Sequence, residues 1–479
     1  MSKKDGVVYT PPEVVERMLD MIGYFPEKMP GFLEMDFLDN SCGNGNILVV
    51  ALERACDAID RMTSCLGFTP EQKYNYFEYG LTRHFHGTEL NADECKKCVE
   101  RMNNVASQYL CQPIDWEWDI RCCDSLSEDD GRKFDFLVCN PPYIRVHDLD
   151  VDLDGYEFVE TGMKDMYLAF YELGLRQLKK NGKMCYITPS SWFTSTAGKK
   201  LRDYLFNNRL ISEIYDYGHT QVFEDATTYV EITVIDKMNP RVGQDYIIYG
   251  SEERGEKKLM IPYPAINLDG KFYFTEPKNT ILLTEISLFH KGNIKVKNGF
   301  ATLADDIFIR DEKPCDSKYV IPVIKSSTGK SSWCIYPYDE HGKLVSDDFV
   351  LSMEAPEARD ILIFNKGKLL DRCTNEPWYA FGRTQAINDT YKDKWTIKSI
   401  IKTVDDINPV KAPAGTGVYG GLYILCDGPE QLECLKTDTF MEYVKSLKKY
   451  KSGGYYTFSS KDLEKFLNWY NFYMKKENG

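Results

Sequence analysis

The sequence predicts an α/β protein whose N-terminal half is a doubly wound, mostly parallel sheet and whose C-terminal half is an α+β region. Two observations support this fold class. Residues 1–240 alternate short apolar segments of strand length with longer segments of helical periodicity, the pattern of a parallel sheet with helices on both faces. From residue 241 to 479 the alternation stops, and tyrosine-rich, β-rich segments follow at irregular spacing. We therefore expect two domains, 1–240 and 241–479.

The individual elements of the first domain follow from their apolar patterns. The expected strands are residues 36–39, 86–90, 118–123, 134–139, 183–188, 211–217 and 230–236. The expected helices are residues 46–61, 92–105, 165–180 and 197–207. Asn181-Gly182 after two lysines is typical of a helix C-terminus, so the third of these helices is expected to end at Lys179-Lys180.

The composition indicates a cytoplasmic protein without a membrane anchor. No apolar run reaches 18 residues, and the N-terminus shows no signal-peptide core. The 15 cysteines are scattered and odd in number, which argues against a disulfide framework. Cys95 and Cys98 form a single C-x-x-C, which we interpret as one face of a helix, and with only six histidines we expect no bound metal.

The net charge of −14 argues against a nucleic-acid partner, because proteins that bind nucleic acids usually show a basic footprint. If the substrate is nevertheless a nucleic acid, positive charge must be gathered on one face while acidic residues lie elsewhere. Whether the substrate is a nucleic acid therefore has to be judged from the candidate site.

A glycine-containing loop follows the first expected strand and opens a helix, with the sequence Asp39-Asn40-Ser41-Cys42-Gly43-Asn44-Gly45-Asn46. In Rossmann-like sheets, ligands bind at the carboxyl ends of the strands where the strand order reverses. Glycines there permit a sharp turn and a close approach of the backbone to a ligand. The candidate cofactor-binding residues of this loop are Asp39, Ser41, Gly43 and Gly45.

The next two strands also end in polar acceptors. Glu89 can accept hydrogen bonds from both ribose hydroxyls of a nucleoside cofactor, and Asp124 can accept one from an adenine amino group. Glu89 lies 50 positions after Asp39, against about 20 in a dinucleotide fingerprint, which indicates an insertion around residues 63–79. Either acid alone is more often a solvated strand end, but three successive strand ends with an acceptor favour a cofactor site.

The fourth expected strand runs directly into Asn140-Pro141-Pro142-Tyr143. The two prolines fix φ and make the chain leave the sheet extended, so that the Asn140 amide oxygen and the Pro141 carbonyl can face one cavity. Two such acceptors suit the methylation of an aromatic amine, because they hold its hydrogens and stabilise the positive charge that grows on nitrogen. Tyr143 offers a ring face for stacking. An ordinary Asn-Pro turn is the alternative interpretation.

Together these motifs resemble the N6-adenine DNA methyltransferases with the "gamma" motif order. Tyr9-Thr10-Pro11-Pro12-Glu13-Val14-Val15 is similar to their N-terminal cofactor motif, Asp39–Asn46 to their glycine loop, and Glu89 and Cys123-Asp124-Ser125-Leu126 to their ribose and adenine contacts. Asn40 replaces a usual proline and Asn91 a common aspartate. Val222-Phe223 resembles the motif whose phenylalanine stacks on the target base.

The resemblance implies S-adenosyl-L-methionine as cofactor and double-stranded DNA as substrate. It also implies base flipping, with Tyr143 and Phe223 on the two faces of the extruded adenine. The catalytic residues it implies are Asn140, Pro141, Pro142, Tyr143 and Phe223. A separate cognate restriction endonuclease is expected if the chain serves a restriction-modification system, because no nuclease motif is evident.

The C-terminal half is expected to be the DNA target-recognition domain. Arg383 and Gln385, within an aromatic segment, are able to read guanine and adenine edges, although a small aromatic core is an equal alternative. Lys448, Lys449 and Lys451 are candidates for phosphate contacts, and a solvated helix end is the alternative.

Two other functions remain open from the sequence. The same tetrapeptide chemistry serves RNA adenine methyltransferases, and a non-catalytic DNA-specificity subunit could keep the fold without the reaction. Comparing methyl transfer to duplex DNA and to RNA distinguishes a DNA methyltransferase from an RNA methyltransferase. Cofactor binding tests whether the chain is a non-catalytic specificity subunit.

Overall fold

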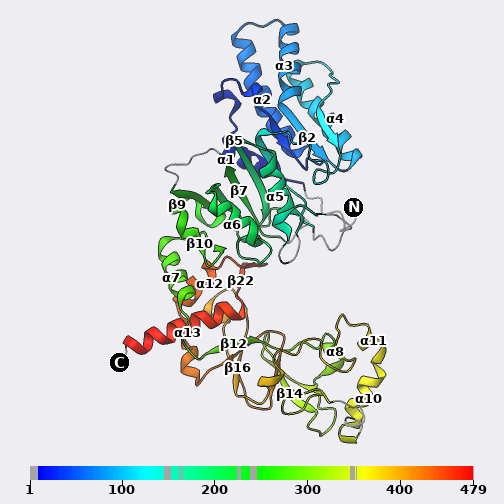
Figure 1. Ribbon diagram of the computed structural model, residues 1–479, viewed down its shortest axis with the longest axis vertical. Coiled ribbons are helices and arrows are strands. Elements are labelled where there is room, and N and C mark those ends of the chain that lie inside the picture. The colour runs from blue at the N-terminus through cyan, green and yellow to red at the C-terminus, as the bar shows by residue number, and fades with distance from the viewer. Residues whose placement is uncertain are drawn as a thin grey trace. The chain divides into compact units, whose positions relative to one another are not determined.

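The structure of this protein is a computed structural model that describes residues 9–144, 153–160, 162, 165–223, 228–237, 245–345, 351 and 353–477. The chain divides into two compact units, Met1–Pro277 and Lys278–Gly479 (Figure 1). The boundary expected at 240/241 is therefore too early. The reason is that two further strands, β8 and β9, pair onto the sheet of the first unit before the chain leaves it.

The first unit is built on a nine-stranded sheet with the order β3-β2-β1-β4-β5-β7-β6-β8-β9. Its strands are β1 (Phe37–Asp39), β2 (Phe85–Glu89), β3 (Asp119–Cys122), β4 (Phe134–Cys139), β5 (Leu178–Pro189), β6 (Ile211–Asp216), β7 (Val230–Asp236), β8 (Tyr246–Ser251) and β9 (Gly255–Pro262). β1 pairs in parallel with β2 on one side and with β4 on the other. The strand order thus reverses at β1, which is where such sheets bind ligands.

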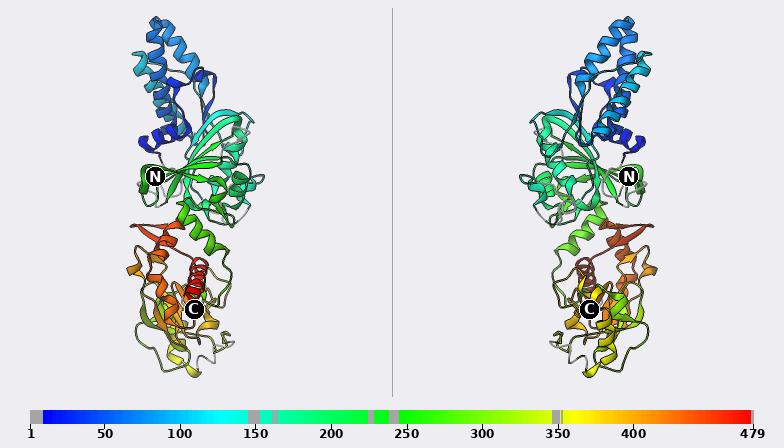
Figure 2. Two further views of the ribbon diagram at one scale, coloured as in Figure 1. Left: turned by 90° about the vertical axis from the view of Figure 1, so that its left-hand side faces the viewer. Right: turned by 90° about the vertical axis from the view of Figure 1, so that its right-hand side faces the viewer.

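Helices cover both faces of this sheet, as Figures 1 and 2 show. They are α1 (Pro12–Ile22), α2 (Asn46–Cys65), α3 (Pro70–His84), α4 (Ala92–Leu110), α5 (Met166–Gln177) and α6 (Lys199–Asn207). Along β4, Phe136 and Val138 face the core formed with α1 to α4, whereas Leu137 and Cys139 face the core formed with α5 and α6. The period-two alternation of β-strands therefore supplies two separate cores.

The predicted strands and helices of the first unit are confirmed, with small differences at their ends. β4 and β7 have the predicted bounds, and the insertion expected around residues 63–79 lies at the end of α2 and in α3. Thr69 begins α3 with a capping box, in which its side chain accepts from the Gln72 amide. Cys95 and Cys98 lie buried on α4, as interpreted from the sequence.

The predicted end of the third helix is wrong. α5 ends at Gln177, and Lys179 and Lys180 already belong to β5, which starts at Leu178 opposite Phe134. The Lys179 ammonium lies 2.7 Å from carboxylate oxygens of both Asp36 and Asp135. The two lysines therefore lie in the strand and not in the last turn of the helix, and ion pairs hold Lys179 at the start of the strand.

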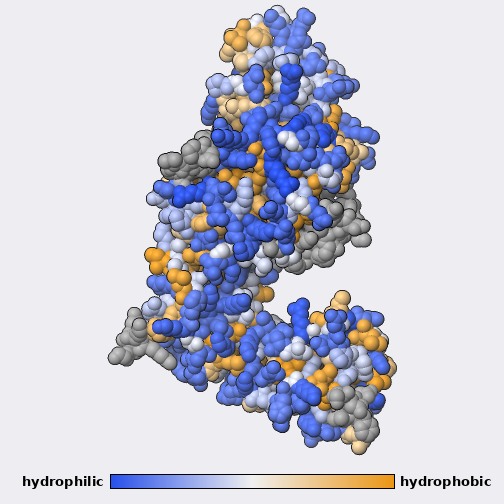
Figure 3. Space-filling model, viewed as in Figure 1, coloured by the Kyte–Doolittle hydropathy of each residue, from blue (hydrophilic) through white to orange (hydrophobic). Residues whose placement is uncertain are grey.

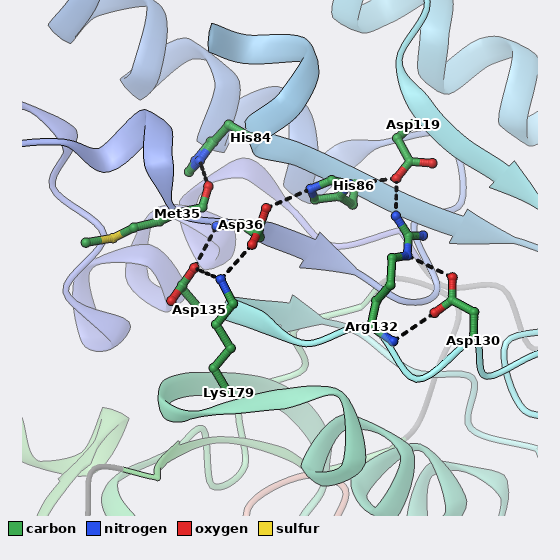
Figure 4. Close-up of polar contacts among 9 residues, drawn as sticks. All are labelled: Met35, Asp36, His84, His86, Asp119, Asp130, Arg132, Asp135 and Lys179. Atoms are coloured by element: carbon green, nitrogen blue, oxygen red, sulfur yellow. Dashed lines mark hydrogen bonds and ion pairs between the residues drawn. The ribbon is translucent and has the colours of Figure 1, made fainter.

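Lys179 is part of a polar network at the amino-terminal edge of the parallel strands (Figure 4). His86 Nδ1 lies 2.6 Å from Asp119 Oδ2, and Asp36 lies between His86 and Lys179. The hydrogen bond from His86, with the neighbouring guanidinium of Arg132, lowers the pKa of Asp119. These groups come from the first residues of neighbouring strands, so the network ties that edge together.

A buried carboxyl group joins β5, β7 and the turn after β5. Glu231 on β7 is fully buried, and its oxygens accept hydrogen bonds from Thr188 Oγ1 at 2.8 Å, Trp192 Nε1 at 2.8 Å and Thr233 Oγ1 at 2.6 Å. Burial raises the pKa of this carboxyl to about 8. Burial therefore favours the protonated form of Glu231 in the folded protein at neutral pH.

In its described residues the second unit, which runs from α7 to α13 in Figure 1, contains three small sheets. Its helices are α7 (Pro277–Leu288), α8 (Asp305–Phe308), α10 (Pro356–Phe364), α11 (Lys366–Leu370), α12 (Asp438–Ser446) and α13 (Ser460–Glu477). One sheet is β12 (Lys295–Asn298), β20 (Leu422–Leu425), β16 (Lys394–Ile397) and β18 (Val410–Ala412). The second is β13 (Ile309–Arg310), β15 (Lys330–Ile335), β14 (Val320–Lys325) and β19 (Gly417–Tyr419), and the third is β17 (Ile400–Ile401), β22 (Tyr455–Thr457) and β21 (Tyr450–Lys451). The α+β class expected for this half is confirmed.

Among the described helices of both units, none is long and apolar enough to span a bilayer.

Replacing Glu231 tests its protonation. The free energy of unfolding contributed by this group should fall as pH rises from about 4.5, its ordinary pKa, to about 8, because only the folded state holds the proton in that interval. Glu231→Gln keeps the neutral form at every pH, so we expect similar stability to wild type near pH 5 and higher stability than wild type near pH 8, measured by urea unfolding.

Glu213→Gln on β6 is the matched control, because Lys258 Nζ lies 2.7 Å from that carboxylate. It should lower stability near pH 8 rather than raise it. Equal pH slopes for wild type and Glu231→Gln would mean that Glu231 is ionised in the fold.

Candidate cofactor and active site

A pocket opens at the carboxyl ends of β1, β2 and β4. The space within it, part of which is open to solvent, is about 540 Å³. Its lining is Tyr9, Thr10, Asp39, Ser41, Cys42, Gly43, Asn46, Ile47, Glu89, Asn140, Pro141, Pro142 and Tyr143. Residues far apart in the sequence, predicted separately as cofactor-binding or catalytic, are thus brought together in one place.

The glycine loop closes this pocket on one side. Gly43 and Gly45 have φ of +52° and +84°, the left-handed region that other residues adopt at a cost. The Gly43 amide donates to Glu89 Oε2 at 2.9 Å, and the Cys42 amide donates to the Thr88 carbonyl at 3.0 Å. The end of β2 therefore sets the shape of the loop after β1.

Asp39 lies at the bottom of the pocket and is 1% exposed. Burial, with a smaller contribution from the negative charge of Glu89, raises the pKa of Asp39 to about 7. Its Oδ1 accepts a hydrogen bond from the Ser41 amide at 3.2 Å. Asp39 thus holds the first turn of the glycine loop, and it lines the cavity as predicted.

The two departures from the family pattern have clear local roles. Asn40 is fully buried, and its amide nitrogen donates to Gln177 Oε1 at 3.1 Å and to the Tyr186 hydroxyl at 3.0 Å. Asn91 caps α4, accepting from the amide of Asp93 at 2.9 Å. Asn40 therefore anchors the loop to β5, and Asn91 fixes the helix behind Glu89.

The segment after β3 is not part of the pocket lining. Asp124 Oδ1 accepts from the Leu126 amide at 3.0 Å. Ser125 is buried and donates to the Asn40 carbonyl at 2.8 Å, and Leu126 is also buried. Ser125 thus braces the start of the glycine loop, while contacts of Asp124, Ser125 and Leu126 with a cofactor stay predictions.

Tyr9 and Thr10, the first residues that the structure describes, belong to the pocket lining. The Tyr9 hydroxyl donates to Glu94 Oε2 at 2.9 Å, and the Pro11 carbonyl begins α1 by accepting from the amides of Val14 and Val15. Thr10 is 3% exposed and lies between the glycine loop and the motif after β4. Tyr9 and Thr10 line the pocket as predicted, whereas Pro11 serves the helix start.

The motif of residues 140–143 leaves β4 toward the same pocket. Asn140 Nδ2 donates to Thr10 Oγ1 at 3.1 Å, and the Tyr143 hydroxyl donates to the Ile187 carbonyl at 2.9 Å. Pro141 is buried and Pro142 is half-buried beside it. This hydrogen bond anchors the hydroxyl end of the Tyr143 side chain to β5.

Phe223 is buried and packs edge-on against Tyr143, with ring centroids 6.1 Å apart and an interplanar angle of 60°. A base between two parallel rings needs planes about 7 Å apart, twice a contact distance of about 3.5 Å. The two rings are therefore neighbours, as the predicted stacking pair requires, but the described arrangement leaves no room for a base between them.

Two residues that the sequence analysis missed also shape the pocket. Arg101 on α4 donates to the Asn44 carbonyl at 2.9 Å and to Asn46 Oδ1 at 2.5 Å, and Asn46 lines the cavity. Arg101 follows Cys98 by three positions, on the helix face that meets Gly45. This spacing places Arg101 and Cys98 on one helix face, which is the sequence signal that could have identified Arg101. The signal can be interpreted only when α4 is known to pack on the glycine loop.

The predicted DNA contacts of the second unit lie on several elements. The backbone of Arg383 pairs with Ala301 and its side chain is exposed, while Gln385 Nε2 donates to the Gly299 carbonyl at 3.0 Å. Lys449 forms an ion pair with Asp462, Lys448 is half-buried, and Lys451 is exposed on β21. Lys449 is thus engaged within the fold, and the DNA-binding role of all five stays a prediction.

The acidic charge is unevenly shared between the units. Residues 1–277 contain 30 lysines and arginines against 46 aspartates and glutamates, whereas residues 278–479 contain 29 against 27. The first unit therefore carries a net charge of −16 and the second +2, which together give the −14 of the chain. The excess of acidic residues lies in the unit that holds the pocket.

Comparison with known proteins assigns the methylase domain. Residues 46–223 match the family described as Eco57I restriction-modification methylase. The type II methyltransferase M.BstVI of Geobacillus stearothermophilus is 26% identical over 397 residues, 72% of this chain and 68% of that protein. The restriction enzyme and methyltransferase RM.Eco57I of Escherichia coli is 26% identical over 349 residues, 60% of this chain but 35% of that protein. This chain thus spans only about a third of that second relative.

The fold of both units has a solved counterpart. The type IIL restriction-modification enzyme MmeI, solved in complex with DNA, matches 96% of this chain and 68% of its own chain with a TM-score of 0.67 and 14% identity. Residues 46–223 therefore resemble an Eco57I-type methylase, and this part of the chain is a DNA methyltransferase domain whose methyl donor is S-adenosyl-L-methionine. The residues of the pocket fit this donor, because the Glu89 carboxylate lines it and is able to accept hydrogen bonds from hydroxyl groups.

Substituting Gly45 tests the packing of the loop. A Cβ at Gly45 would lie 2.6 Å from Cys98 Sγ in addition to the strain of a positive φ, whereas Gly67, with φ +70°, has no atom within 4 Å of its Cβ position. We expect Gly67→Ala to lose about 1 kcal/mol of unfolding free energy and Gly45→Ala about 1–3 kcal/mol more, because overpacking adds to the backbone cost. Equal losses in urea unfolding would rule out a tight contact between the loop and α4.

Proposed function

We propose that this Eco57I-type methylase transfers a methyl group from S-adenosyl-L-methionine to the N6 amino nitrogen of an adenine flipped out of duplex DNA. The observation that carries the proposal is the position of residues 140–143. They leave β4 at the reversal of the strand order, in the same cavity as the glycine loop and Glu89. This motif corresponds to the Asn-Pro-Pro-Tyr motif of the gamma motif order described above.

The residues of the pocket have separate tasks in this proposal. Bound in it, the donor supplies an electrophilic methyl carbon on a sulfonium and is left as a neutral thioether. Glu89 holds the ribose, and the glycine loop accommodates the backbone side of the donor. The Asn140 amide oxygen and the Pro141 carbonyl accept hydrogen bonds from the adenine amino group. They stabilise the positive charge that develops on N6 before its proton passes to solvent.

The aromatic pair provides the stacking surface for the extruded base. The hydroxyl end of Tyr143 is anchored by the hydrogen bond to the Ile187 carbonyl, and Phe223 lies beside the ring. Unstacking a base costs a few kcal/mol, and each stacking contact contributes about 1–3 kcal/mol. Because the two rings now pack edge-on, we expect Phe223 to move when a base enters.

We assign target recognition to the second unit. Its balance of charge is more favourable to a polyanion than that of the first unit, and the fold counterpart MmeI was solved in complex with DNA. Arg383, Gln385, Lys448 and Lys451 are the candidates for base and phosphate contacts. A cognate endonuclease would be a separate protein of the same restriction-modification system.

Methyl transfer from labelled donor tests the reaction itself. We expect label in duplex DNA and not in RNA of the same sequence, and digestion to nucleosides should place it in N6-methyl-2′-deoxyadenosine. Asn140→Ala should lower kcat by about 10²- to 10³-fold, because one of two preorganised acceptors is lost, while the Kd of the donor changes less than about threefold. Label in RNA, or in a cytosine, would contradict the proposed substrate.

The role of Glu89 is tested by binding. Glu89→Ala should raise the Kd of S-adenosyl-L-methionine by about 10- to 100-fold, because hydrogen bonds to a charged acceptor are lost, as measured by isothermal titration calorimetry. Glu128→Ala removes an exposed acid outside the pocket and should leave the Kd unchanged. An unaltered Kd in Glu89→Ala would exclude this carboxylate from the donor site.

A further inference from the structure

A continuous set of hydrogen bonds connects α4 to the motif after β4. Arg101 donates to Asn46 Oδ1 at 2.5 Å, Asn46 Nδ2 donates to the Thr10 carbonyl at 3.2 Å, and Asn140 Nδ2 donates to Thr10 Oγ1 at 3.1 Å. Thr10 is therefore held at its backbone by the glycine loop while its side chain contacts Asn140.

The hydrogen bonds that Asn46 forms with Arg101 and Thr10 allow only one orientation of its side-chain amide. Arginine has only donors and a main-chain carbonyl has only an acceptor, so the Asn46 amide must turn its oxygen to Arg101 and its nitrogen to Thr10. The position of Thr10 is thus fixed by two groups whose roles cannot be exchanged. Thr10 is also 3% exposed, so water does not compete for its hydroxyl.

A threonine hydroxyl can donate or accept, and in the structure Thr10 Oγ1 accepts from Asn140 Nδ2, so the nitrogen end of the Asn140 amide faces Thr10. A carboxamide has an acceptor end and a donor end of nearly equal size, and rotation by half a turn exchanges them. With its nitrogen held by Thr10 Oγ1, Asn140 turns its oxygen away from Thr10. The reverse orientation would offer donors where the reaction needs an acceptor.

We propose that Thr10 is a positioning residue for methyl transfer, which anchors the nitrogen of the Asn140 amide so that its oxygen is directed to the substrate amino group. This inference rests on the proposed function, because it assigns a purpose to the Asn140 oxygen. It differs from the donor contact that the sequence resemblance implies for Thr10, since it predicts an effect on the chemical step rather than on donor binding.

Two substitutions at Thr10 separate these roles. Thr10→Val keeps the shape of the side chain but removes the hydroxyl, and we expect kcat to fall by about 10- to 100-fold while the Kd of the donor stays within about threefold. Thr10→Ser restores the acceptor and should keep kcat within about threefold of wild type. The melting temperature of both variants, measured by circular dichroism, checks that the fold is intact.

A double-mutant cycle distinguishes orientation from a general structural effect. In Asn140→Asp the side chain has two oxygens and no nitrogen, so no wrong orientation exists. In that background, Thr10→Val should lower the single-turnover rate by less than about threefold. A loss as large as in the Asn140 background would overturn the proposal.

Other outcomes are equally informative. An unchanged kcat in Thr10→Val would overturn the positioning role, and so would a Kd that rises by the same factor as the loss in kcat/KM, because Thr10 would then be a donor ligand. If Asn140→Ala itself remains active, the proposed function fails instead. If Asn140→Ala is inactive and Thr10→Val is normal, only the inference about Thr10 fails.

Discussion

β1 lies between two parallel neighbours, with β2 on one side of it and β4 on the other. Because all three strands run in the same direction, their carboxyl ends and the loops that follow lie at one edge. Asp39, Glu89 and Asn140 come from three different parts of the sequence, and this constraint alone brings them into one cavity. The glycine loop, the N-terminal segment and the motif after β4 then complete its walls.

Buried polar groups hold this arrangement and are costly by themselves. Asp39 and Glu231 are carboxyl groups whose pKa values burial raises to about 7 and about 8, respectively. Each is compensated by accepted hydrogen bonds, from the Ser41 amide in one case and from three side chains in the other. Burial of these carboxyl groups thus lowers the stability of the fold while their hydrogen bonds fix the local geometry, as is common where binding sites need preorganised groups.

Much of the first unit could be predicted from the sequence, because buried parallel strands and amphipathic helices have distinct periodicities. β4 and the start of α2 were predictable for this reason, and so was the convergence of Glu89 and Asn140. The end of α5 was not, because the ion pairs of Lys179 with Asp36 and Asp135 join residues distant in sequence. The contacts of Arg101 with the glycine loop, and that between Thr10 and Asn140, could not be predicted for the same reason. In the second unit, short strands from distant segments pair with little periodic signal, so only its α+β class could be predicted.

The extension of the first sheet beyond residue 240 matters for anyone who divides this chain. β8 pairs with β6 over four residues, and β9 covers β8 in turn. A fragment that stops at residue 240 would expose the unsatisfied amides and carbonyls of β6 along an open edge, and open edges recruit strands from other molecules. Such a fragment would tend to self-associate, whereas a fragment that ends after Pro277 retains its own edge protection.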